Sequence, residues 1–211
     1  EIKVGITSER NSSGSLLTDV LDWNYAVVHN VRLHLTTYGK HIWPKGGRRE
    51  SGYGDTEFKV KWRFLDEDTE GGRRPAMGIA PKVFMPTAND KRGLGDGAWR
   101  FQVPLQFGKT VGRWYHFGEA GYQWASGSAT DSAYGGMGTL RSLTDHFALG
   151  TELFGGIPTD NGNNWQLLTT LGAVYTFNAH WQLKGSVSHT LRGTARGGPS
   201  PSGVFYLVWN F

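Results

Sequence analysis

Hydrophobic and polar residues alternate along almost the whole chain, and the alternation is clearest in residues 57–64. Apolar and charged side chains there occupy opposite sets of positions: Phe58, Val60, Trp62 and Phe64 against Glu57, Lys59, Lys61 and Arg63. Successive side chains of a strand point to opposite faces, so this period of two predicts an amphipathic strand. A soluble sheet with one solvated face gives the same pattern, as does a membrane barrel with lipid outside and a wet lumen inside.

The same period of two predicts twelve strands, because helical periodicity is nearly absent. The expected strands are 1–9, 16–27, 31–36, 57–64, 75–86, 98–109, 114–125, 134–143, 147–155, 164–177, 181–191 and 203–211. Proline cannot donate to a strand ladder, so Pro81 and Pro86 predict a bend or bulge in the fifth strand.

The connections between these strands alternate in length. The longer ones are 39–52, 87–97, 126–133, 156–163 and 192–202; the shorter ones are 110–113, 144–146 and 178–180, with 66–74 as an exception. Outer-membrane barrels have an even number of strands, short periplasmic turns and longer outer loops. The chain therefore predicts one all-β domain over 1–211, an antiparallel up-and-down transmembrane barrel with both termini in the periplasm.

The last strand, 203–211, ends the chain on an apolar face formed by Phe205, Leu207, Trp209 and Phe211. A naked apolar edge invites aggregation, whereas barrel closure removes the edge. We expect this strand to pair with 1–9. Its terminal aromatics resemble the signal that the barrel-assembly machinery reads during insertion, which makes that machinery an expected partner.

Composition limits the alternatives. The chain has 211 residues, 31 Gly and only 38% hydrophobic residues, which is thin for a soluble core of this length. No run of 18 apolar residues is present, so a transmembrane helix is excluded. A negative mean hydropathy is compatible with a barrel whose interior is polar.

Cysteine and charge narrow the class further. The absence of cysteine excludes a disulfide framework and fits passage through an oxidising periplasm. The net charge of +4 is mild and scattered, so no nucleic-acid partner is expected. No signal peptide stands at Glu1, so we expect either the mature form of an exported outer-membrane protein or a trimmed form of it.

The polar positions of the strands predict the lumen, and the strand ends predict an aromatic girdle. The expected lumen residues are Glu57, Lys59, Lys61, Arg63, Arg100, Gln102, Gln106, Glu119, Gln123, Glu152, Gln182 and Lys184. The expected girdle residues are Trp114, Trp124, Trp165, Trp181 and Trp209. The lumen residues set charge selectivity in an open pore or pair with one another to plug a narrow one, and the sequence leaves both open.

The sequence gives little support for a catalytic or metal-binding site. Ser188 and His189 are adjacent and so point to opposite faces, and no nucleophile accompanies His116. No zincin or nucleophile-elbow motif occurs. Loop carboxylates and amides at Asp90, Asp96, Asp160 and Asn161 are more typical of turns than of a calcium site. We expect no enzyme, no metal and no cofactor.

Several short motifs, taken in their order, resemble the outer-membrane family named "MetA-pathway of phenol degradation". They are Tyr53-Gly-Asp-Thr56, Pro81-Lys-Val-Phe-Met-Pro-Thr87, Gly93-Leu-Gly-Asp-Gly97, Gly118-Glu-Ala-Gly-Tyr122 and Leu149-Gly-Thr-Glu152, with the terminal aromatic strand. The resemblance covers roughly residues 16–211. It implies an outer-membrane barrel that passes small, often aromatic or hydrophobic, molecules, and it supplies no catalytic residues.

We therefore predict passive passage of small molecules through a polar lumen, in a barrel that contacts lipid and lipopolysaccharide. Two alternatives remain at this stage: a soluble lipocalin-like binding protein, and a structural or lipid-modifying barrel that does not conduct. The substrate and the oligomeric state do not follow from the sequence.

Overall fold

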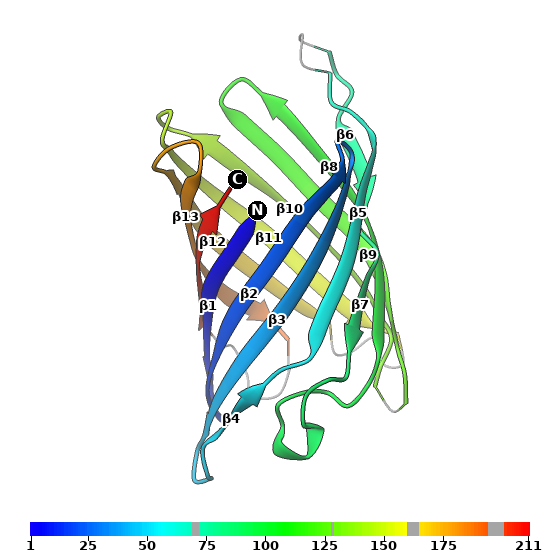
Figure 1. The fold of residues 1–211 in the computed structure, drawn as a ribbon, viewed down its shortest axis with the longest axis vertical. Helices are drawn as coiled ribbons and strands as arrows, with labels where there is room; N and C mark the ends of the chain where they lie inside the picture. Colours follow the sequence, from blue (N-terminus) through cyan, green and yellow to red (C-terminus); the bar gives the residue numbers. More distant parts are fainter. Residues whose placement is uncertain (69–71, 128, 160–164, 194–200) are drawn as a thin grey trace.

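The computed structural model describes residues 1–211 except 69–71, 128, 160–164 and 194–200. Its strands form one curved sheet that encloses a central space (Figure 1). They are β1 (Ile2–Asn11), β2 (Gly14–Val28), β3 (Val31–Pro44), β4 (Glu50–Tyr53), β5 (Thr56–Leu65), β6 (Ala76–Ile79), β7 (Lys82–Met85), β8 (Arg100–Val111), β9 (Trp114–Ala125), β10 (Ser132–Ser142), β11 (Phe147–Pro158), β12 (Gln166–Thr176), β13 (Trp181–Arg192) and β14 (Pro201–Trp209). A 3₁₀ turn, η1 (Asp90–Arg92), lies between β7 and β8.

These strands build a closed antiparallel barrel of twelve strands. Each strand pairs with its neighbour in sequence, β4 extends the edge of β3 ahead of β5, and β6 and β7 together fill one strand position between β5 and β8. The barrel closes where β1 pairs with β14, from Ile2 opposite Trp209 to Glu9 opposite Ser202. The predicted strand number, topology and closing pair are therefore confirmed.

The large apolar side chains lie on the outside of this barrel. Met137 is 67% exposed and Phe205 is 60% exposed, and exposed aromatic or aliphatic residues recur at every second position along the strands. Fully buried apolar side chains are few and include Leu94 and Val208. A bilayer satisfies such an outward apolar face, and closure pairs the backbone groups that lipid leaves without partners. No helix long and apolar enough to cross a bilayer occurs in the described part of the chain.

Two predicted loop boundaries are wrong. The expected loop over 39–52 is mostly strand, because β3 continues to Pro44 and pairs with β4, with Gly39 opposite Tyr53 and Ile42 opposite Glu50. The connection expected between strands 1–9 and 16–27 is only a two-residue turn, in which the Asn11 side chain accepts a hydrogen bond from the Ser13 amide. Gly and polar residues there indicated loops, but backbone pairing with a neighbouring strand extends both hairpins.

The fifth barrel strand breaks as its prolines predicted. Strand β6 ends at Ile79 and β7 begins at Lys82, so the ladder is interrupted at Ala80 and Pro81. The Ala80 amide still donates to the Pro104 carbonyl, and the Pro81 carbonyl accepts from Val60, which keeps the segment in the wall.

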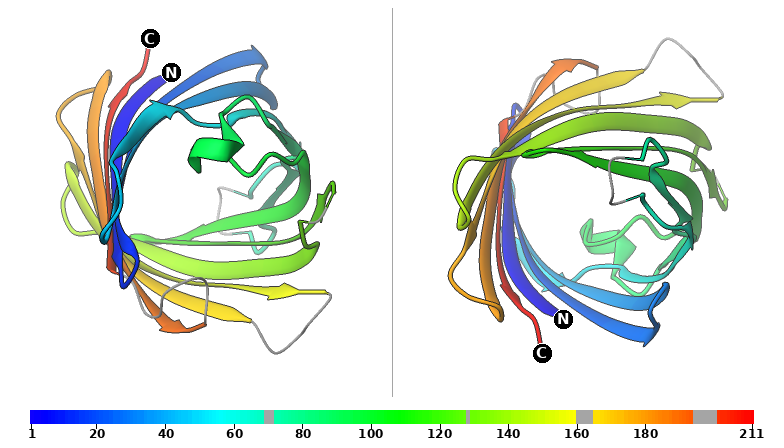
Figure 2. Two further views of the ribbon diagram at one scale, coloured as in Figure 1. Left: turned by 90° about the horizontal axis from the view of Figure 1, so that it is seen from below. Right: turned by 90° about the horizontal axis from the view of Figure 1, so that it is seen from above.

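The two ends of the barrel differ. We call the end that holds both termini the terminal end; its turns join β2–β3, β5–β6, β8–β9, β10–β11 and β12–β13. We call the opposite end the loop end. There residues 86–99, which we call the mouth loop, carry η1 over part of the opening that the strands enclose (Figure 2).

Candidate functional site: the barrel lumen

The strand register places the predicted lumen residues on the face opposite the exposed apolar side chains. One lateral row runs from Lys59 through Lys82 and Gln102 to Gln123, across β5, β7, β8 and β9. The Gln102 amide donates to Gln123 Oε1 at 2.6 Å. Rows of this kind and the strand alternation bring to the inner face Glu57, Lys59, Lys61, Arg63, Arg100, Gln102, Gln106, Glu119, Gln123, Glu152, Gln182 and Lys184.

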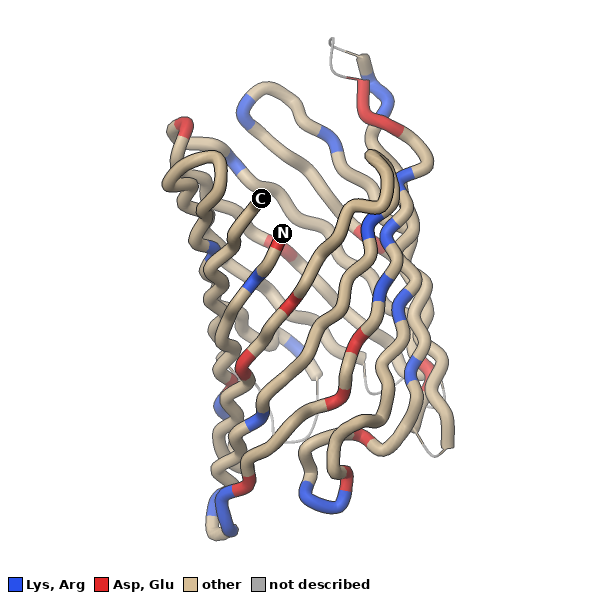
Figure 3. Tube along the Cα trace, viewed as in Figure 1, with Lys and Arg blue, Asp and Glu red and all other residues tan. Residues whose placement is uncertain are grey.

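The inner face is divided into two unlike halves. Lys and Arg gather along β5, β7 and the start of β8 (Figure 3). We call the inner faces of β1–β3, β5, β7 and β8 the charged wall, and those of β10–β13 the small-residue wall. The small-residue wall is dominated by small and hydroxyl side chains, among them Gly136, Gly138, Gly150, Thr170, Gly172, Ser186 and Ser188.

A buried ionic cluster centres on Asp22 in the charged wall. The Asp22 carboxylate accepts a hydrogen bond from the Thr36 hydroxyl at 3.1 Å and lies 3.3 Å from Lys3 Nζ. His34 Nδ1 lies 3.8 Å from the same carboxylate, and Asn24 is only 3% exposed. Sequence reasoning missed this cluster, although Asp22 and Asn24 occupy polar positions that alternate with the apolar Trp23 along the strand.

Glu57 belongs to a second buried cluster rather than to an open lumen surface. It is 7% exposed, accepts a hydrogen bond from the Tyr38 hydroxyl at 3.2 Å, and pairs with Lys59 at 3.4 Å. Its position in the inner face agrees with the sequence pattern. Its partners come from β3 and β5. Tyr38 lies beyond the expected strand 31–36, because β3 continues to Pro44, so sequence reasoning missed this contact.

The mouth loop is fastened to the loop end by one buried carboxylate. Asp55, 6% exposed, accepts hydrogen bonds from the Ala88 amide at 3.1 Å and the Asp96 amide at 3.0 Å. Leu94 is 2% exposed and packs over Gly52, where an added Cβ would lie 2.7 Å from Leu94 Cδ1. The loop is therefore held by specific contacts and has a defined position across the opening.

Arg92 adds a more exposed contact on the same loop. Its guanidinium lies 2.6 Å from Glu50 and donates to the Ser51 carbonyl at 3.0 Å. A neighbouring ion pair joins Arg100 to Asp96 at 2.7 Å. Asp55 and Asp96 therefore both help to hold the mouth loop at the loop end.

At the terminal end, residues 66–68 and 72–75 lie beside the end of β8 and the β8–β9 turn. Glu67 accepts a hydrogen bond from the Thr110 amide at 2.6 Å and lies 3.5 Å from Lys109 Nζ. Lys109 also donates to the Asp68 carbonyl at 2.8 Å. The hydrogen bond from the Thr110 amide, with Lys109 nearby, lowers the pKa of Glu67 below its usual value.

The predicted girdle tryptophans occupy both ends of the barrel. Trp114, Trp181 and Trp209 lie at the terminal end, where Trp181 and Trp209 stack with ring centroids 6.1 Å apart. Trp124 lies near the loop end against Phe101 and Tyr122. Trp165 also lies at that end, under the Arg192 guanidinium at 4.4 Å. Further exposed aromatics that the girdle prediction did not include are Trp23, Tyr25, Trp62, Trp99, Tyr175 and Phe177.

Groups with catalytic or metal-binding potential have ordinary roles. The Ser188 hydroxyl hydrogen-bonds Thr170 at 2.8 Å, on the face opposite His189. His146 and His180 hydrogen-bond the carbonyls of Thr176 and Asn210 beside their turns. Within the described ranges, no group of three His, Asp or Glu side chains is arranged to hold a metal ion. Asp160 and Asn161 lie outside the described residues.

Comparison with known proteins finds similar solved structures but no match among family models or curated proteins. No model of a known protein family matches the chain, and no curated protein matches it. Among solved structures, the chain is similar to an outer-membrane channel from Pseudomonas putida F1, at 16% identity and a TM-score of 0.74, over 100% of this chain and 95% of that one. It is also similar to the NanC porin, at 6% identity and a TM-score of 0.72, over 99% of this chain and 100% of that one.

A third similar structure is the KdgM porin in complex with disordered oligogalacturonate. It is 8% identical, with a TM-score of 0.64, over 99% of each chain. The TM-scores show that these proteins share their fold with this chain, and at identities this low they show the fold alone.

Proposed function

We propose that this protein is an outer-membrane channel for the passive passage of small solutes through a polar, water-filled lumen. One observation carries the proposal. Of the twelve inner-face residues predicted from the sequence, all except Glu57 retain partial or full exposure to solvent. Charged groups without water or a partner are costly, so these side chains require a hydrated interior. A hydrated interior that is open at both ends is a solute path.

The mouth loop limits the size of the solutes. It crosses the loop end and is fastened there through Asp55 and Leu94. A twelve-stranded barrel is intermediate between small barrels filled by side chains and wide porins. We therefore assign the channel to small molecules, and the resemblance to the phenol-degradation family extends this to hydrophobic or aromatic ones.

The membrane setting follows from the outward faces. We assign the terminal end to the periplasm and the loop end to the cell exterior, with the aromatic residues at the two lipid interfaces. Lipopolysaccharide is then the expected outer-leaflet contact. Phe205, Leu207, Trp209 and Phe211 form an exposed apolar row on β14 and just after it, which supports their role as the assembly signal.

A liposome-swelling assay tests the proposal. Purified protein is first shown to be folded by its heat-modifiable mobility and is then reconstituted into liposomes. We expect swelling in pentoses to be faster than in tetrasaccharides, with protein-free liposomes as the control. Equal swelling in both kinds of liposome would contradict the channel and would favour the non-conducting barrel.

The inner-face charges provide a second measurement. Lys61 is exposed, and no ion pair or hydrogen bond to it is present in the part of the chain that the structure describes. Lys61→Gln removes one positive charge from the path and should shift the reversal potential in a salt gradient toward cations. Glu57→Gln should shift it in the opposite direction by less, because Glu57 is buried and already paired.

A further inference from the structure

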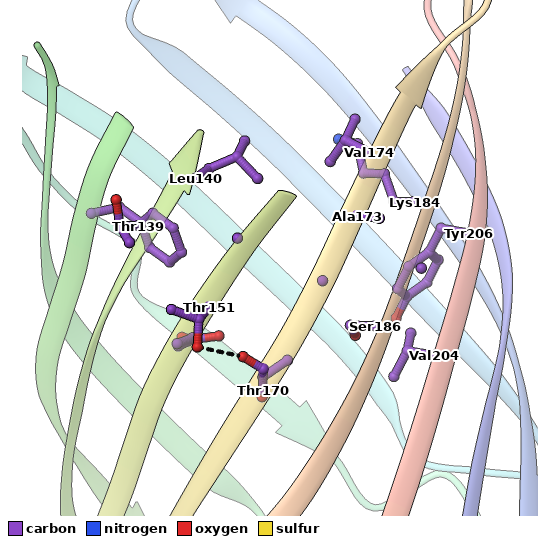
Figure 4. A pocket seen from close by; sticks show the side chains of 15 residues that line it. Thr139, Leu140, Thr151, Thr170, Ala173, Val174, Lys184, Ser186, Val204 and Tyr206 are labelled. Carbon is purple, nitrogen blue, oxygen red and sulfur yellow. Dashed lines mark hydrogen bonds between the residues drawn. The ribbon is translucent and has the colours of Figure 1, made fainter. Parts of the chain in front are cut away.

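The small-residue wall contains a hollow that opens to the lumen. Its volume is about 210 Å³, and its lining comes from β9 to β14 (Figure 4). The floor is one lateral row in which Gly150 lies opposite Gly172, Gly172 opposite Ser186, and Ser186 opposite Val204. The hollow exists because these positions lack large side chains.

Apolar groups line the sides of the hollow. Phe117 and Leu140 lie toward β9 and β10, and Val174 and Tyr206 lie toward β12 and β14 (Figure 4). A dry cavity of about 150 Å³ with such a lining is large enough to hold benzene. The hollow therefore has room for a molecule with one ring or a branched chain of similar size.

Two opposite charges also line this hollow. Glu152 on β11 and Lys184 on β13 both line it. Neither makes a hydrogen bond or an ion pair with any described residue, whereas Lys3 is paired with Asp22 and Lys59 with Glu57. Charged side chains at an apolar surface are normally paired, so these two lack counterparts that a ligand can supply.

The register separates the two charges along the barrel. Glu152 lies opposite Thr170, and Lys184 lies opposite Val174, four positions further along β12. At the rise of a strand this is about 13 Å along β12, and the two strand spacings from β11 to β13 add about 10 Å across it, so the two Cα atoms lie about 16 Å apart. Extended side chains shorten the gap, and an apolar body with one charged group at each end fits between them.

We propose that the hollow binds small zwitterions whose carboxylate and ammonium groups are separated by an apolar body. The carboxylate binds Lys184, the ammonium binds Glu152, and the body lies over Gly172 between Phe117 and Tyr206. This inference rests on the proposed channel function and names its substrate class. A neutral solute or a simple ion leaves at least one of the two charges without a partner.

Isothermal titration calorimetry on the detergent-solubilised barrel tests the proposal. The probe is 4-(aminomethyl)benzoate, and the one-ended comparisons are 4-methylbenzoate and 4-methylbenzylamine. We expect the zwitterion to bind at least tenfold more tightly than either comparison. Lys184→Gln and Glu152→Gln should each weaken its binding about tenfold, and Lys45→Gln, which removes a positive charge from the β3–β4 turn, should not change it.

A steric variant tests the position of the site. A Cβ at Gly172 would meet its nearest atoms at 3.5 Å, which is ordinary contact, so Gly172→Leu fills the hollow without a backbone clash. We expect this variant to keep its heat-modifiable mobility and to lose binding. Equal affinity for the three compounds, or zwitterion binding that survives Gly172→Leu or both charge variants, would overturn the proposal.

The channel and the zwitterion-binding site are separate proposals, and experiments can distinguish the failure of one from the failure of the other. Conductance without zwitterion binding would remove the binding site and leave the channel. Binding by a barrel that does not conduct would support the site and remove the channel.

Discussion

The mouth loop depends on Asp55, and Asp55→Ala should release it. The carboxylate accepts the Ala88 and Asp96 amides at 3.1 and 3.0 Å and is 6% exposed. The substitution leaves both amides without that acceptor. It leaves the barrel ladder intact, because Asp55 lies between β4 and β5 rather than within a strand.

The contacts of the loop contribute unequally. A hydrogen bond to a charged group contributes about 1.5–3 kcal/mol, so the two amides together contribute about 3–6 kcal/mol if their effects add. The exposed pair between Arg92 and Glu50 contributes about 0–1 kcal/mol, because exposed ion pairs are weak. At the low end, losing about 3 kcal/mol raises the population of the undocked loop roughly 100-fold.

Limited trypsin digestion measures this population at the Lys91 and Arg92 sites in the loop. When loop release precedes cleavage, the cleavage rate follows the open population. We expect Asp55→Ala to be cut roughly 100-fold faster than the wild type and Asp55→Asn, which keeps one acceptor oxygen, to be intermediate. Glu50→Gln is the matched control and should be cut within about fivefold of the wild-type rate.

Single-channel conductance gives an independent reading of the same change, because release of the loop widens the opening at the loop end. Asp55→Ala should therefore conduct more than the wild type at the same salt concentration. The reasoning would be refuted if Asp55→Ala were cleaved at the wild-type rate, or if Glu50→Gln released the loop equally well.

Two other predictions concern the Glu67–Thr110 contact at the end of β8 and Phe211, which follows β14. Since the pKa of Glu67 is lowered, its contact with Thr110 is fully present above the ordinary glutamate pKa of about 4.3 and is lost as the pH falls through the lowered value. Hydrogen exchange at the Thr110 amide, corrected for intrinsic pH dependence, should show this loss in the wild type and a flat response in Glu67→Gln. Deletion of Phe211 should reduce the heat-modifiable fraction in cell membranes several-fold while leaving the conductance of the assembled fraction unchanged; normal assembly would count against the signal.

The fold was predictable because lipid imposes one simple constraint on every strand. Side chains that face lipid are apolar, as at Phe58 and Trp62, and those that face water are polar, as at Lys59 and Lys61. This alternation, together with loop lengths, was sufficient for strand number and closure. The ends of hairpins were less predictable, because β3 and β4 pair through Gly-rich and polar segments beyond the apolar pattern.

The contacts between side chains in the lumen were not predictable from the sequence. Alternation identified which side chains face inward, yet the partners of an inward group depend on the stagger between strands. Asp22 contacts Lys3 and Thr36 from two different strands, and Asp55 meets a loop more than thirty residues away. The hollow over Gly172 was equally hidden, since a glycine in a strand reveals space only when its lateral neighbours are known.

Planar-bilayer recording tests the central claim most directly. Folded, heat-modifiable protein added to a lipid bilayer in potassium chloride should give discrete, small conductance steps, and Lys61→Gln should change their charge selectivity. A bilayer that stays silent, with insertion of the folded barrel shown independently, would contradict a water-filled path through this lumen.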